Sequence, residues 1–244
     1  MRCLVIADIH ANLAAFEAVL AAAGEFNEIW CLGDIVGYGP DPDACVALLR
    51  GYPHVAVAGN HDWAAIGRLD LYEFNPSARA AAEWTSSQLR PESREYLEGL
   101  ATSHSQGAFT LVHGSVRHPI WEYVDEPSVA RQNFELLRTN YCLVGHTHVP
   151  VLYTMADAGS GSVDELPLDG DDVGLRLGAR PVILNPGSVG QPRDGDPRAA
   201  FALLDPDAAE VELRRVRYPI PATQQRIVTV GLPHRNAARL ALGL

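Results

Sequence analysis

Continuous apolar runs alternate with helix-like segments at the start of the chain. The runs occupy residues 2–7, 28–33 and 55–58, and their lack of polar alternation is typical of strands buried on both faces. Helices are predicted between them, over residues 12–24 and 40–50. The order strand, helix, strand, helix, strand predicts parallel βαβ units, in which ligands bind beyond the carboxyl ends of the strands.

The pattern changes to a helix-rich insert at residues 63–102. Within it, Asn75-Pro76 and Pro91 each begin a helical segment. Because the insert follows the third strand, we expect it to lie near the carboxyl ends of the strands as a helical, cap-like element. Its aromatic side chains are interpreted as packing residues rather than substrate contacts, since aromatic residues dominate protein cores. They are Trp63, Tyr72 and Trp84.

Short strands dominate the rest of the chain. Apolar runs at 109–112 and 141–144 flank a predicted helix at 127–138. Further strands are expected at 151–156, 173–177, 181–185, 199–204 and 210–218. We expect these to form a second, mostly antiparallel sheet stacked on the first. The acidic stretch 157–172 is expected to be a mobile loop, and the tail at 219–244 to carry helices that close a sheet edge or serve a homodimer.

Composition bounds the fold and the partners. The 244 residues are 47% hydrophobic and 20% charged, which is ordinary for a soluble globular protein, and one α/β domain over residues 1–244 is expected. A net charge of −11 argues against a long nucleic-acid partner, whose phosphates require clustered basic residues. Short phosphorylated substrates are compatible with this charge because bound metal ions would reverse the local field.

Residue usage excludes several chemistries. All 19 basic residues are Arg, and a chain without Lys uses neither a P-loop lysine nor a Schiff base. The four cysteines lack CxxC spacing and three lie in predicted strands, so we expect free buried thiols and a reducing cytoplasm. The chain starts directly with a strand, so no signal peptide is expected, and no apolar run is long enough to cross a membrane.

Polar motifs directly follow five of the predicted strands. They are Asp8-Ile9-His10, Gly33-Asp34, Gly59-Asn60-His61-Asp62, His113-Gly114 and Gly145-His146-Thr147-His148. Imidazoles, carboxylates and one carboxamide that converge from strand ends make a mixed nitrogen and oxygen site, which suits divalent transition metals. A structural zinc site would favour thiolates, and these motifs contain none.

Seven side chains of these motifs are candidate metal ligands: Asp8, His10, Asp34, Asn60, His113, His146 and His148. One tetrahedral ion takes about four ligands, so seven ligands suit two ions better. Asp34 has two carboxylate oxygens and can bridge the pair. Two-metal sites hold their ions about 3.5–4 Å apart and clamp the attacking and leaving oxygens of a phosphoryl transfer. A hydroxide that bridges the metals would be the nucleophile.

His61 is the histidine of these motifs that remains outside the ligand set. It adjoins Asn60, which places it to protonate the leaving alkoxide of an ester, with Asp62 orienting its ring. The alternative is that His61 is a structural histidine beside the ligands. Taken together, the order and spacing of the five motifs indicate a catalytic metal centre more strongly than any one of them does.

The combination resembles the calcineurin-like metallophosphoesterase superfamily over residues 8–148, and again at the Asn185-Pro186-Gly187-Ser188 turn. The resemblance implies an α/β fold of four αββα layers, in which two stacked mixed sheets are flanked by helices. It implies two divalent metal ions, from among Mn, Fe, Zn and Ni, and a catalytic role for His61. The first ion would take Asp8, His10, Asp34 and His148, and the second Asp34, Asn60, His113 and His146.

One position departs from part of that family. Its serine/threonine phosphatases and symmetrical diadenosine tetraphosphatases carry a GDxVxRG motif whose Arg holds substrate phosphate, whereas Tyr38 stands at that position here. This departure favours the small, broad-specificity bacterial phosphodiesterase type. Tyr38 and Arg193 are therefore the candidate substrate-binding residues. Arg193, which follows the NPGSVGQP segment, is either a replacement contact for phosphate or a surface residue.

The leading interpretation is a cytoplasmic metallophosphoesterase that hydrolyses small or nucleotide-like phosphodiesters, with monoesters as a second substrate class. An alternative is a catalytically silent interaction module on the same fold, although such modules lose ligands that are all present here. A diadenosine polyphosphate or protein phosphatase is a further alternative. A nuclease is disfavoured for long substrates by the acidic balance.

Overall fold

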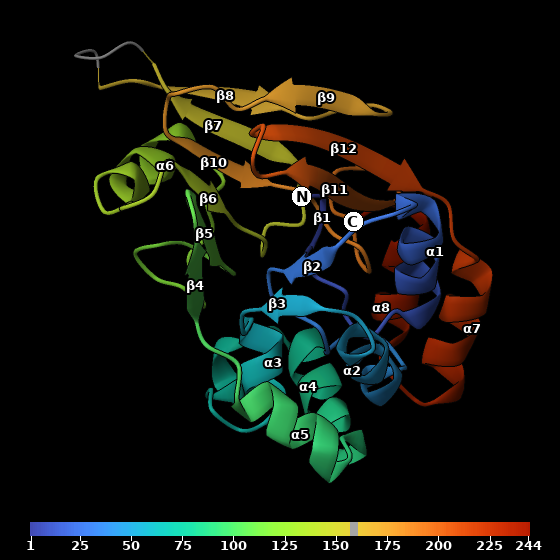
Figure 1. Ribbon diagram of the computed structural model, residues 1–244. Helices are drawn as coiled ribbons and strands as arrows, with labels where there is room; N and C mark the ends of the chain where they lie inside the picture. Colours follow the sequence, from blue (N-terminus) through green and yellow to red (C-terminus); the bar gives the residue numbers. More distant parts are fainter. Residues whose placement is uncertain (157–160) are drawn as a thin grey trace.

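Two mixed sheets of six strands each pack face to face, with helices on their outer sides (Figure 1). The computed structural model describes residues 1–156 and 161–244. The first sheet has the strand order β3-β2-β1-β11-β12-β9, and the second has the order β4-β5-β6-β10-β7-β8. The αββα architecture expected from the resemblance is therefore confirmed.

The first sheet begins with the parallel strands predicted from the apolar runs. Its members are β1 (Cys3–Ile6), β2 (Glu28–Cys31), β3 (His54–Ala56), β9 (Val173–Arg176), β11 (Ala199–Asp205) and β12 (Glu210–Val216). Those of the second sheet are β4 (Ser103–Gln106), β5 (Phe109–Val112), β6 (Tyr141–Leu143), β7 (Val151–Met155), β8 (Val163–Pro167) and β10 (Val182–Asn185).

The helices cover the two outer faces and one end of the sandwich (Figure 1). They are α1 (Leu13–Ala23), α2 (Pro42–Arg50), α3 (Asn60–Ala65), α4 (Pro76–Gln88), α5 (Pro91–Glu98), α6 (Pro127–Phe134), α7 (Ile220–Thr229) and α8 (His234–Ala238), with short 3-10 turns at Leu71–Glu73 and Arg239–Ala241. In the described part of the chain, none of them combines the length and the apolarity needed to cross a bilayer.

Alternate residues of β1 face two different cores. Cys3 and Val5 pack between the sheets, whereas Leu4 and Ile6 pack under the helices of the first sheet. Because both faces are covered, all four residues are buried. This is why the strand is a continuous apolar run in the sequence and not an alternating one.

The later strands are distributed differently from the expectation that they build a second sheet of their own. β11 pairs antiparallel with β1, with Leu4 opposite Leu203, and β12 and β9 extend that sheet further. The strands β7, β8 and β10 complete the other sheet. β11 is buried along nearly all its length, so it belongs at the centre of a sheet and covers the otherwise open edge of β1.

The two edge strands of the second sheet, β4 and β8, also differ from the prediction. Within the stretch 157–172, which was expected to be a loop, β8 pairs with β7; residues 157–160 of that stretch lie outside the described residues. β4 was not expected at all, since its sequence SHSQ carries no apolar residue. Both strands are largely exposed, so no buried apolar run marks them in the sequence. The helix expected at 127–138 is α6, which ends at Phe134.

The insert at 63–102 is helical as expected, and α3, α4 and α5 gather at one end of the molecule (Figure 1). Trp84 packs partly buried in a cluster that also contains Phe74 and residues of the C-terminal helices. Tyr72 differs from the packing interpretation, because its side chain is 82% exposed and lies under the Arg79 guanidinium.

Candidate metal centre

The loops that leave β1, β2, β5 and β6 bring the motif residues to one place. Asp8 and His10 follow β1, Asp34 follows β2, and His113 directly follows β5. His146 and His148 follow β6, and Asn60 is the first residue of α3. All seven candidate ligands are buried. The structure therefore brings together every residue that the sequence nominated as a ligand.

Five of the seven ligands have left-handed backbone conformations. Their φ angles are 55° for Asp8, 48° for His10, 53° for Asp34, 68° for His146 and 62° for His148. Asp8 and His10 lie in the loop after β1, which ends at Ile6, and not on the strand itself. A left-handed non-glycine residue costs about 1–2 kcal/mol. Strain of this kind is typical of functional sites.

Backbone hydrogen bonds between the loops hold these conformations. The amides of Asp8 and His10 donate to the carbonyls of Gly33 and Asp34, at 3.0 and 2.9 Å. The Asn185-Pro186-Gly187-Ser188 turn supports the loops from behind. Asn185 Nδ2 donates to the Gly145 carbonyl at 2.7 Å, and Ser188 Oγ donates to the Asp8 carbonyl at 2.9 Å. The turn thus braces the loops that carry Asp8, His146 and His148.

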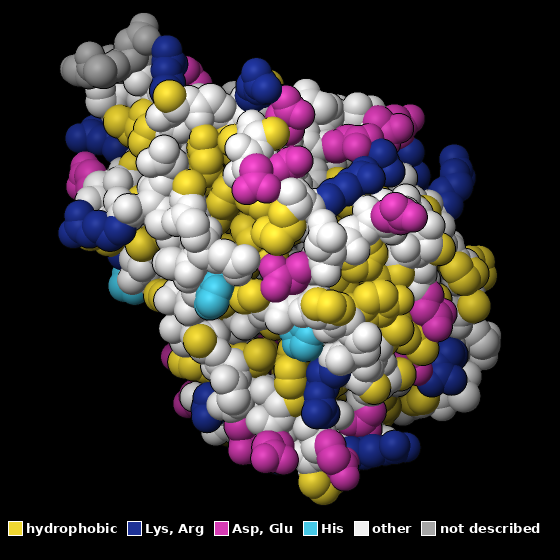
Figure 2. Space-filling model, in the orientation of Figure 1, with side chains coloured by type: hydrophobic (Ala, Val, Ile, Leu, Met, Phe, Trp, Pro, Cys, Tyr) yellow, Lys and Arg dark blue, Asp and Glu magenta, His cyan; other side chains and the backbone are white. Residues whose placement is uncertain are grey.

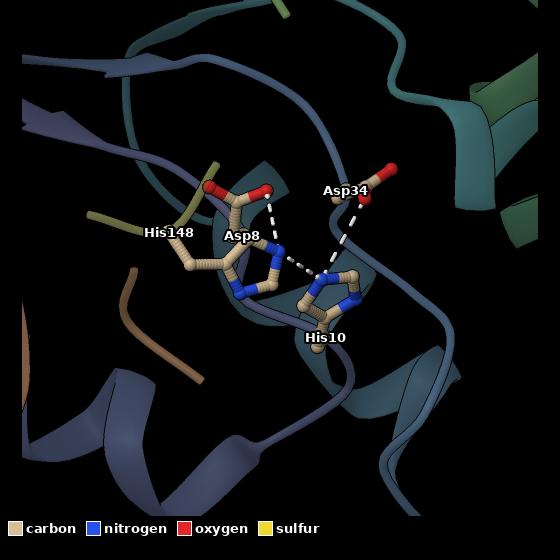
Figure 3. A group of neighbouring side chains, drawn as sticks. All are labelled: Asp8, His10, Asp34 and His148. Atoms are coloured by element: carbon tan, nitrogen blue, oxygen red, sulfur yellow. Dashed lines mark hydrogen bonds and ion pairs between the residues drawn. The ribbon is translucent and has the colours of Figure 1, made fainter. Parts of the chain in front are cut away.

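The first ligand group consists of Asp8, His10, Asp34 and His148, whose donor atoms lie within 4.8 Å of one another (Figure 3). His10 Nε2 lies 3.2 Å from His148 Nε2 and 3.6 Å from Asp34 Oδ2. His148 Nε2 lies 3.4 Å from Asp8 Oδ1. Figure 3 shows the two imidazoles and the two carboxylates turned toward a common centre.

A second ligand group contains Asp34, His113 and His146. His113 Nε2 lies 3.0 Å from His146 Nδ1 and 3.5 Å from Asp34 Oδ2. The Asn60 side-chain oxygen Oδ1 adds a neutral donor atom 3.2 Å from His113 Nε2. Because Asp34 Oδ2 faces both groups, its carboxylate joins two adjoining sets of ligands.

Hydrogen bonds to backbone carbonyls fix the tautomers of all four histidines. Nδ1 of His10, His113 and His148 faces the carbonyls of Val36, Leu32 and Gln191, at 3.2, 2.8 and 2.6 Å respectively. Nε2 of His146 faces the Trp121 carbonyl at 3.2 Å. A carbonyl only accepts, so each of these nitrogens carries the proton and the other nitrogen presents a lone pair. The lone pairs therefore face one another across the two centres.

The donor set fits divalent cations. Burial lowers the pKa of His10, His146 and His148, and lowers that of His113 to about 4, so the rings are neutral at pH 7. Neutral imidazole lone pairs and carboxylates are the forms that bind metal. Asp34 Oδ2 is buried without a hydrogen-bond partner, and burial raises the pKa of Asp34 to about 7. A divalent cation bound between these atoms would offset both the repulsion between the facing lone pairs and the cost of burying the carboxylate charge.

His61 lines the cavity that lies over the ligand groups, and its ring lies between two aromatic rings. Its ring centroid lies 4.3 Å from that of Tyr38 and 5.2 Å from that of Phe74. A Cβ atom added at Gly37, which has a φ of 90°, would lie 2.7 Å from His61 Nδ1. The glycine therefore gives the ring its space. Burial lowers the pKa of His61.

Asp62 does not orient the His61 ring by a direct hydrogen bond, contrary to the expectation. Its carboxylate accepts hydrogen bonds from the amides of Gly59 and Val36, at 2.9 and 3.1 Å. His61 Nδ1 is buried and without a hydrogen-bond partner. Asp62 instead caps the first turn of α3 and ties it to the loop after β2, which fixes the backbone from which His61 projects.

A cavity of about 100 Å³ lies over the ligand groups. Both candidate substrate-binding residues line it. Tyr38 is nearly fully buried, and its ring lies 4.8 Å from that of His10. Arg193 is partly buried and reaches the cavity with its guanidinium carbon 6.0 Å from the centre of the Tyr38 ring. Of the two expectations for Arg193, the structure supports the one in which it faces the site.

Three aromatic residues of the cavity were missed by the sequence analysis: Phe74, Trp121 and Tyr123. The Tyr123 ring stacks on the His146 ring, with centroids 4.1 Å apart and planes 7° apart. Trp121 and Tyr123 lie between the fourth and fifth motifs, and the short aromatic segment that contains them was the signal that could have pointed to them.

A larger, shallower concavity of about 590 Å³ lies over β9, β11 and β12, and it is lined by residues outside the ligand set.

The surface charge is mixed on the face drawn in Figure 2. Dark blue Arg side chains lie interspersed with magenta acidic ones, without forming a continuous band. Binding of long nucleic acids requires a basic stripe that follows the phosphates. The face shown is therefore consistent with the small-substrate interpretation.

Comparisons with known proteins agree with this geometry. A family model described as the calcineurin-like phosphoesterase superfamily domain matches residues 1–209. A crystal structure of a metallophosphoesterase from Sphaerobacter thermophilus is similar with a TM-score of 0.90 and 49% identity, over 100% of this chain and 99% of that one.

Two curated relatives are also similar. An uncharacterized protein of Methanocaldococcus jannaschii is 35% identical over 98% of this chain and 97% of its own length. A symmetrical bis(5'-nucleosyl)-tetraphosphatase of Glaesserella parasuis is 26% identical over 54% of this chain. The match spans about half of that enzyme, 51% of its length, so it covers only part of both proteins.

Proposed function

The chain belongs to the calcineurin-like phosphoesterase superfamily, and from this premise we propose that it hydrolyses small or nucleotide-like phosphodiesters, with phosphomonoesters as a second substrate class. One observation carries the proposal. Two sets of neutral imidazoles and carboxylates share Asp34 Oδ2 at the floor of a cavity that also contains His61 and Arg193. These are the groups that a dinuclear phosphoesterase requires.

Two divalent ions, Mn, Fe, Zn or Ni, would occupy the two groups. We assign Asp8, His10, Asp34 and His148 to the first ion, and Asp34, Asn60, His113 and His146 to the second. When bound, such ions lower the pKa of a water to supply the nucleophile and neutralise charge on the phosphoryl oxygens. The carbonyls that hold the imidazole protons keep the ligand nitrogens aimed at the ions.

His61 is assigned the role of general acid. It protonates the leaving alkoxide oxygen as the bond from phosphorus to that oxygen breaks. Burial keeps the ring neutral in the free protein. The negative charge of a bound phosphoryl group would raise its pKa and so load the proton that the leaving group needs. Asp62 supports this role through the backbone of α3.

Tyr38 and Arg193 would contact the phosphoryl group. The guanidinium offers charge-assisted hydrogen bonds, and the phenol offers one neutral donor. Phe74 and Ala78 of the insert close the cavity on the His61 side, which supports a cap-like role for residues 63–102. The limited volume favours small substituents or substrates of which only the phosphoryl portion enters.

Hydrolysis of dinucleoside polyphosphates is a second candidate. The observation in its favour is the partial match to the symmetrical bis(5'-nucleosyl)-tetraphosphatase of Glaesserella parasuis. Tyr38 in place of the phosphate-binding Arg counts against it.

We further propose that the chain is one domain over residues 1–244. We also propose that it acts in the cytoplasm, since its four cysteines are free and buried. We also propose that the tail at residues 219–244 serves a homodimer.

The experiment is a metal titration with chromogenic esters. The metal-free protein is loaded with Mn²⁺, Fe²⁺, Zn²⁺ or Ni²⁺ and assayed with p-nitrophenyl phosphate, its bis ester and a dinucleoside polyphosphate. Hydrolysis of either nitrophenyl ester in proportion to bound metal supports the proposal. Full metal loading without hydrolysis of any of the three would favour the silent interaction module.

A further inference from the structure

We propose that Arg193 and Tyr123 form a paired clamp for the non-esterified oxygens of the substrate phosphoryl group, and that this clamp sets the ratio of monoester to diester hydrolysis. The inference rests on the proposed function. It concerns two loops that line the cavity, one after β5 and one after β10.

Arg193 is a cation whose nearest carboxylate charges, those of Asp8 and Asp34, act on it without forming an ion pair. Its Nη2 donates to Gln191 Oε1 at 3.1 Å, while its Nε is buried without a hydrogen-bond partner. A partly buried cation is costly unless an anion pairs with it. Because Arg193 lines the cavity above the ligand groups, that anion is a phosphoryl group placed there.

Tyr123 lines the cavity from the loop after β5. Its ring stacks flat on His146, and its side chain is 44% exposed. Tyr123 and Arg193 line the same cavity, and the positive charge of Arg193 acts on the Tyr123 hydroxyl. The stacked ring is held in one orientation, so its hydroxyl is a fixed donor beside the guanidinium.

The loop that carries Arg193 is held rigidly by a buried ion pair. The adjacent residue Asp194 accepts a hydrogen bond from Arg215 of β12, and these side chains are only 7% and 2% exposed. The Arg193 amide also donates to the His148 carbonyl at 3.3 Å. Arg215 is thus a positioning residue, since it fixes the backbone next to Arg193 from behind and does not line the cavity.

Charge decides what such a clamp selects. A phosphomonoester at neutral pH has up to two negative charges on three free oxygens, whereas a diester has one charge on two. The extra oxygen and charge can pair with Arg193 and Tyr123, while two metal ions serve the remaining oxygens in both classes. Loss of the clamp should therefore weaken monoester hydrolysis more than diester hydrolysis.

The test compares Arg193→Gln and Tyr123→Phe with wild type and with Arg176→Gln. Arg176 serves as the charge-matched control because it is 73% exposed on β9. For each protein, kcat and KM are measured for p-nitrophenyl phosphate and its bis ester, together with metal content. We expect Arg193→Gln to lower monoester kcat/KM by about tenfold or more, and diester kcat/KM by about threefold or less. Tyr123→Phe should shift the ratio in the same direction by less.

Binding of inorganic phosphate to the metal-loaded proteins, measured by calorimetry, separates this inference from the proposed function. If wild type binds phosphate but hydrolyses no ester, and both clamp variants bind phosphate more weakly, the clamp stands as a phosphate-binding site and the proposed function fails. If phosphate affinity and the ester ratio equal those of wild type in Arg193→Gln with its metals retained, the clamp is refuted. Equal losses for both ester classes would also overturn it.

A conservative pair tests the positioning role. Arg215→Met removes the ion pair behind the loop, and Arg215→Lys retains a charge there. We expect Arg215→Met to raise the KM for the monoester with metal content unchanged, and Arg215→Lys to recover part of the loss. A fall in thermal stability without any change in the monoester-to-diester ratio would show that Arg215 is structural only.

Discussion

The Nε2 atoms of His10 and His148 face each other at 3.2 Å, although neither carries a proton. In both rings Nδ1 donates to a backbone carbonyl, so two lone pairs point at one another in a buried place. His113 and His146 repeat the relationship at 3.0 Å. Such contacts are repulsive without a cation between them. The fold therefore holds these side chains ready for metal before any metal arrives.

Asp34 is expected to control both metals. Asp34→Asn preserves shape but removes the charge of the oxygen that faces both ligand groups, so metal content should fall at both sites and turnover should be lost. Elemental analysis and esterase assays measure the two effects. A variant that kept wild-type metal content and rate would refute the bridging assignment.

His61 is expected to act in chemistry without binding metal. His61→Ala should lower kcat by about 10²–10⁴-fold, which is the usual contribution of general acid catalysis. Both metals should remain, because the ligand sets do not include it. The loss should shrink for nitrophenyl esters, whose leaving groups need less protonation. Loss of metal in this variant would show instead that the residue maintains the centre.

Gly37→Ala should impair catalysis by pushing on the His61 ring. The added Cβ would lie 2.7 Å from His61 Nδ1, at a glycine with a φ of 90°. Gly67→Ala is the matched control, since Gly67 has a φ of 79° with nothing within 4 Å of the added atom. Both variants should lose about 1–2 kcal/mol of stability. Only the first should lose a large part of kcat, and equal kcat values in both would contradict this account.

Stabilisation by metal should depend on pH. Burial raises the pKa of Asp34 to about 7, and burial with the Asp34 charge raises that of Asp8. Both folded-state values lie above the unfolded ones, so the metal-free protein loses stability as pH rises through about 7 and these carboxyls ionise. At lower pH, an ion must displace their protons. Added Mn²⁺ should therefore raise Tm more at about pH 8 than at about pH 6.

The values of Tm with and without metal are compared at the same pH. The contribution from protonation of the unfolded chain is the same in both and therefore cancels. The four ligand histidines stay neutral over this range, because burial lowers their pKa values. Differential scanning fluorimetry with a chelator as the reference gives both values of Tm. An equal rise at the two pH values would mean that the carboxyls are already ionised in the metal-free protein.

The ligands were predictable because each follows an apolar strand within a few residues. Their convergence depends on the parallel order of β1, β2 and β3, which the sequence pattern indicates, and on the stacked second sheet, in which β5 and β6 are also parallel, a pairing that the pattern did not indicate. Their left-handed backbones were not predictable, since they depend on hydrogen bonds between loops distant in sequence. The strands β4 and β8 were missed because both are exposed edge strands, which no buried apolar run marks in the sequence.

For a different reason, the sequence left two alternatives open for Arg193 and did not single out Tyr123. Their direction depends on how two long loops fold over the site, and neither loop has a periodic pattern. An Arg after a turn is usually exposed. The residue next to Arg193, Asp194, pairs with a buried Arg215 in β12, a contact between residues 21 positions apart that the sequence does not reveal.

The pairing of β1 with β11 has a consequence for synthesis of the protein. β1 is among the first segments to leave the ribosome, yet its partner on one side begins at Ala199. Until then β1 has an unpaired apolar edge, open to other chains. Closing so long a loop is slow. His10 therefore waits through most of translation, and His146 and His148 wait until β11 has been made, before the sheet behind them is complete, so metal capture becomes a late event.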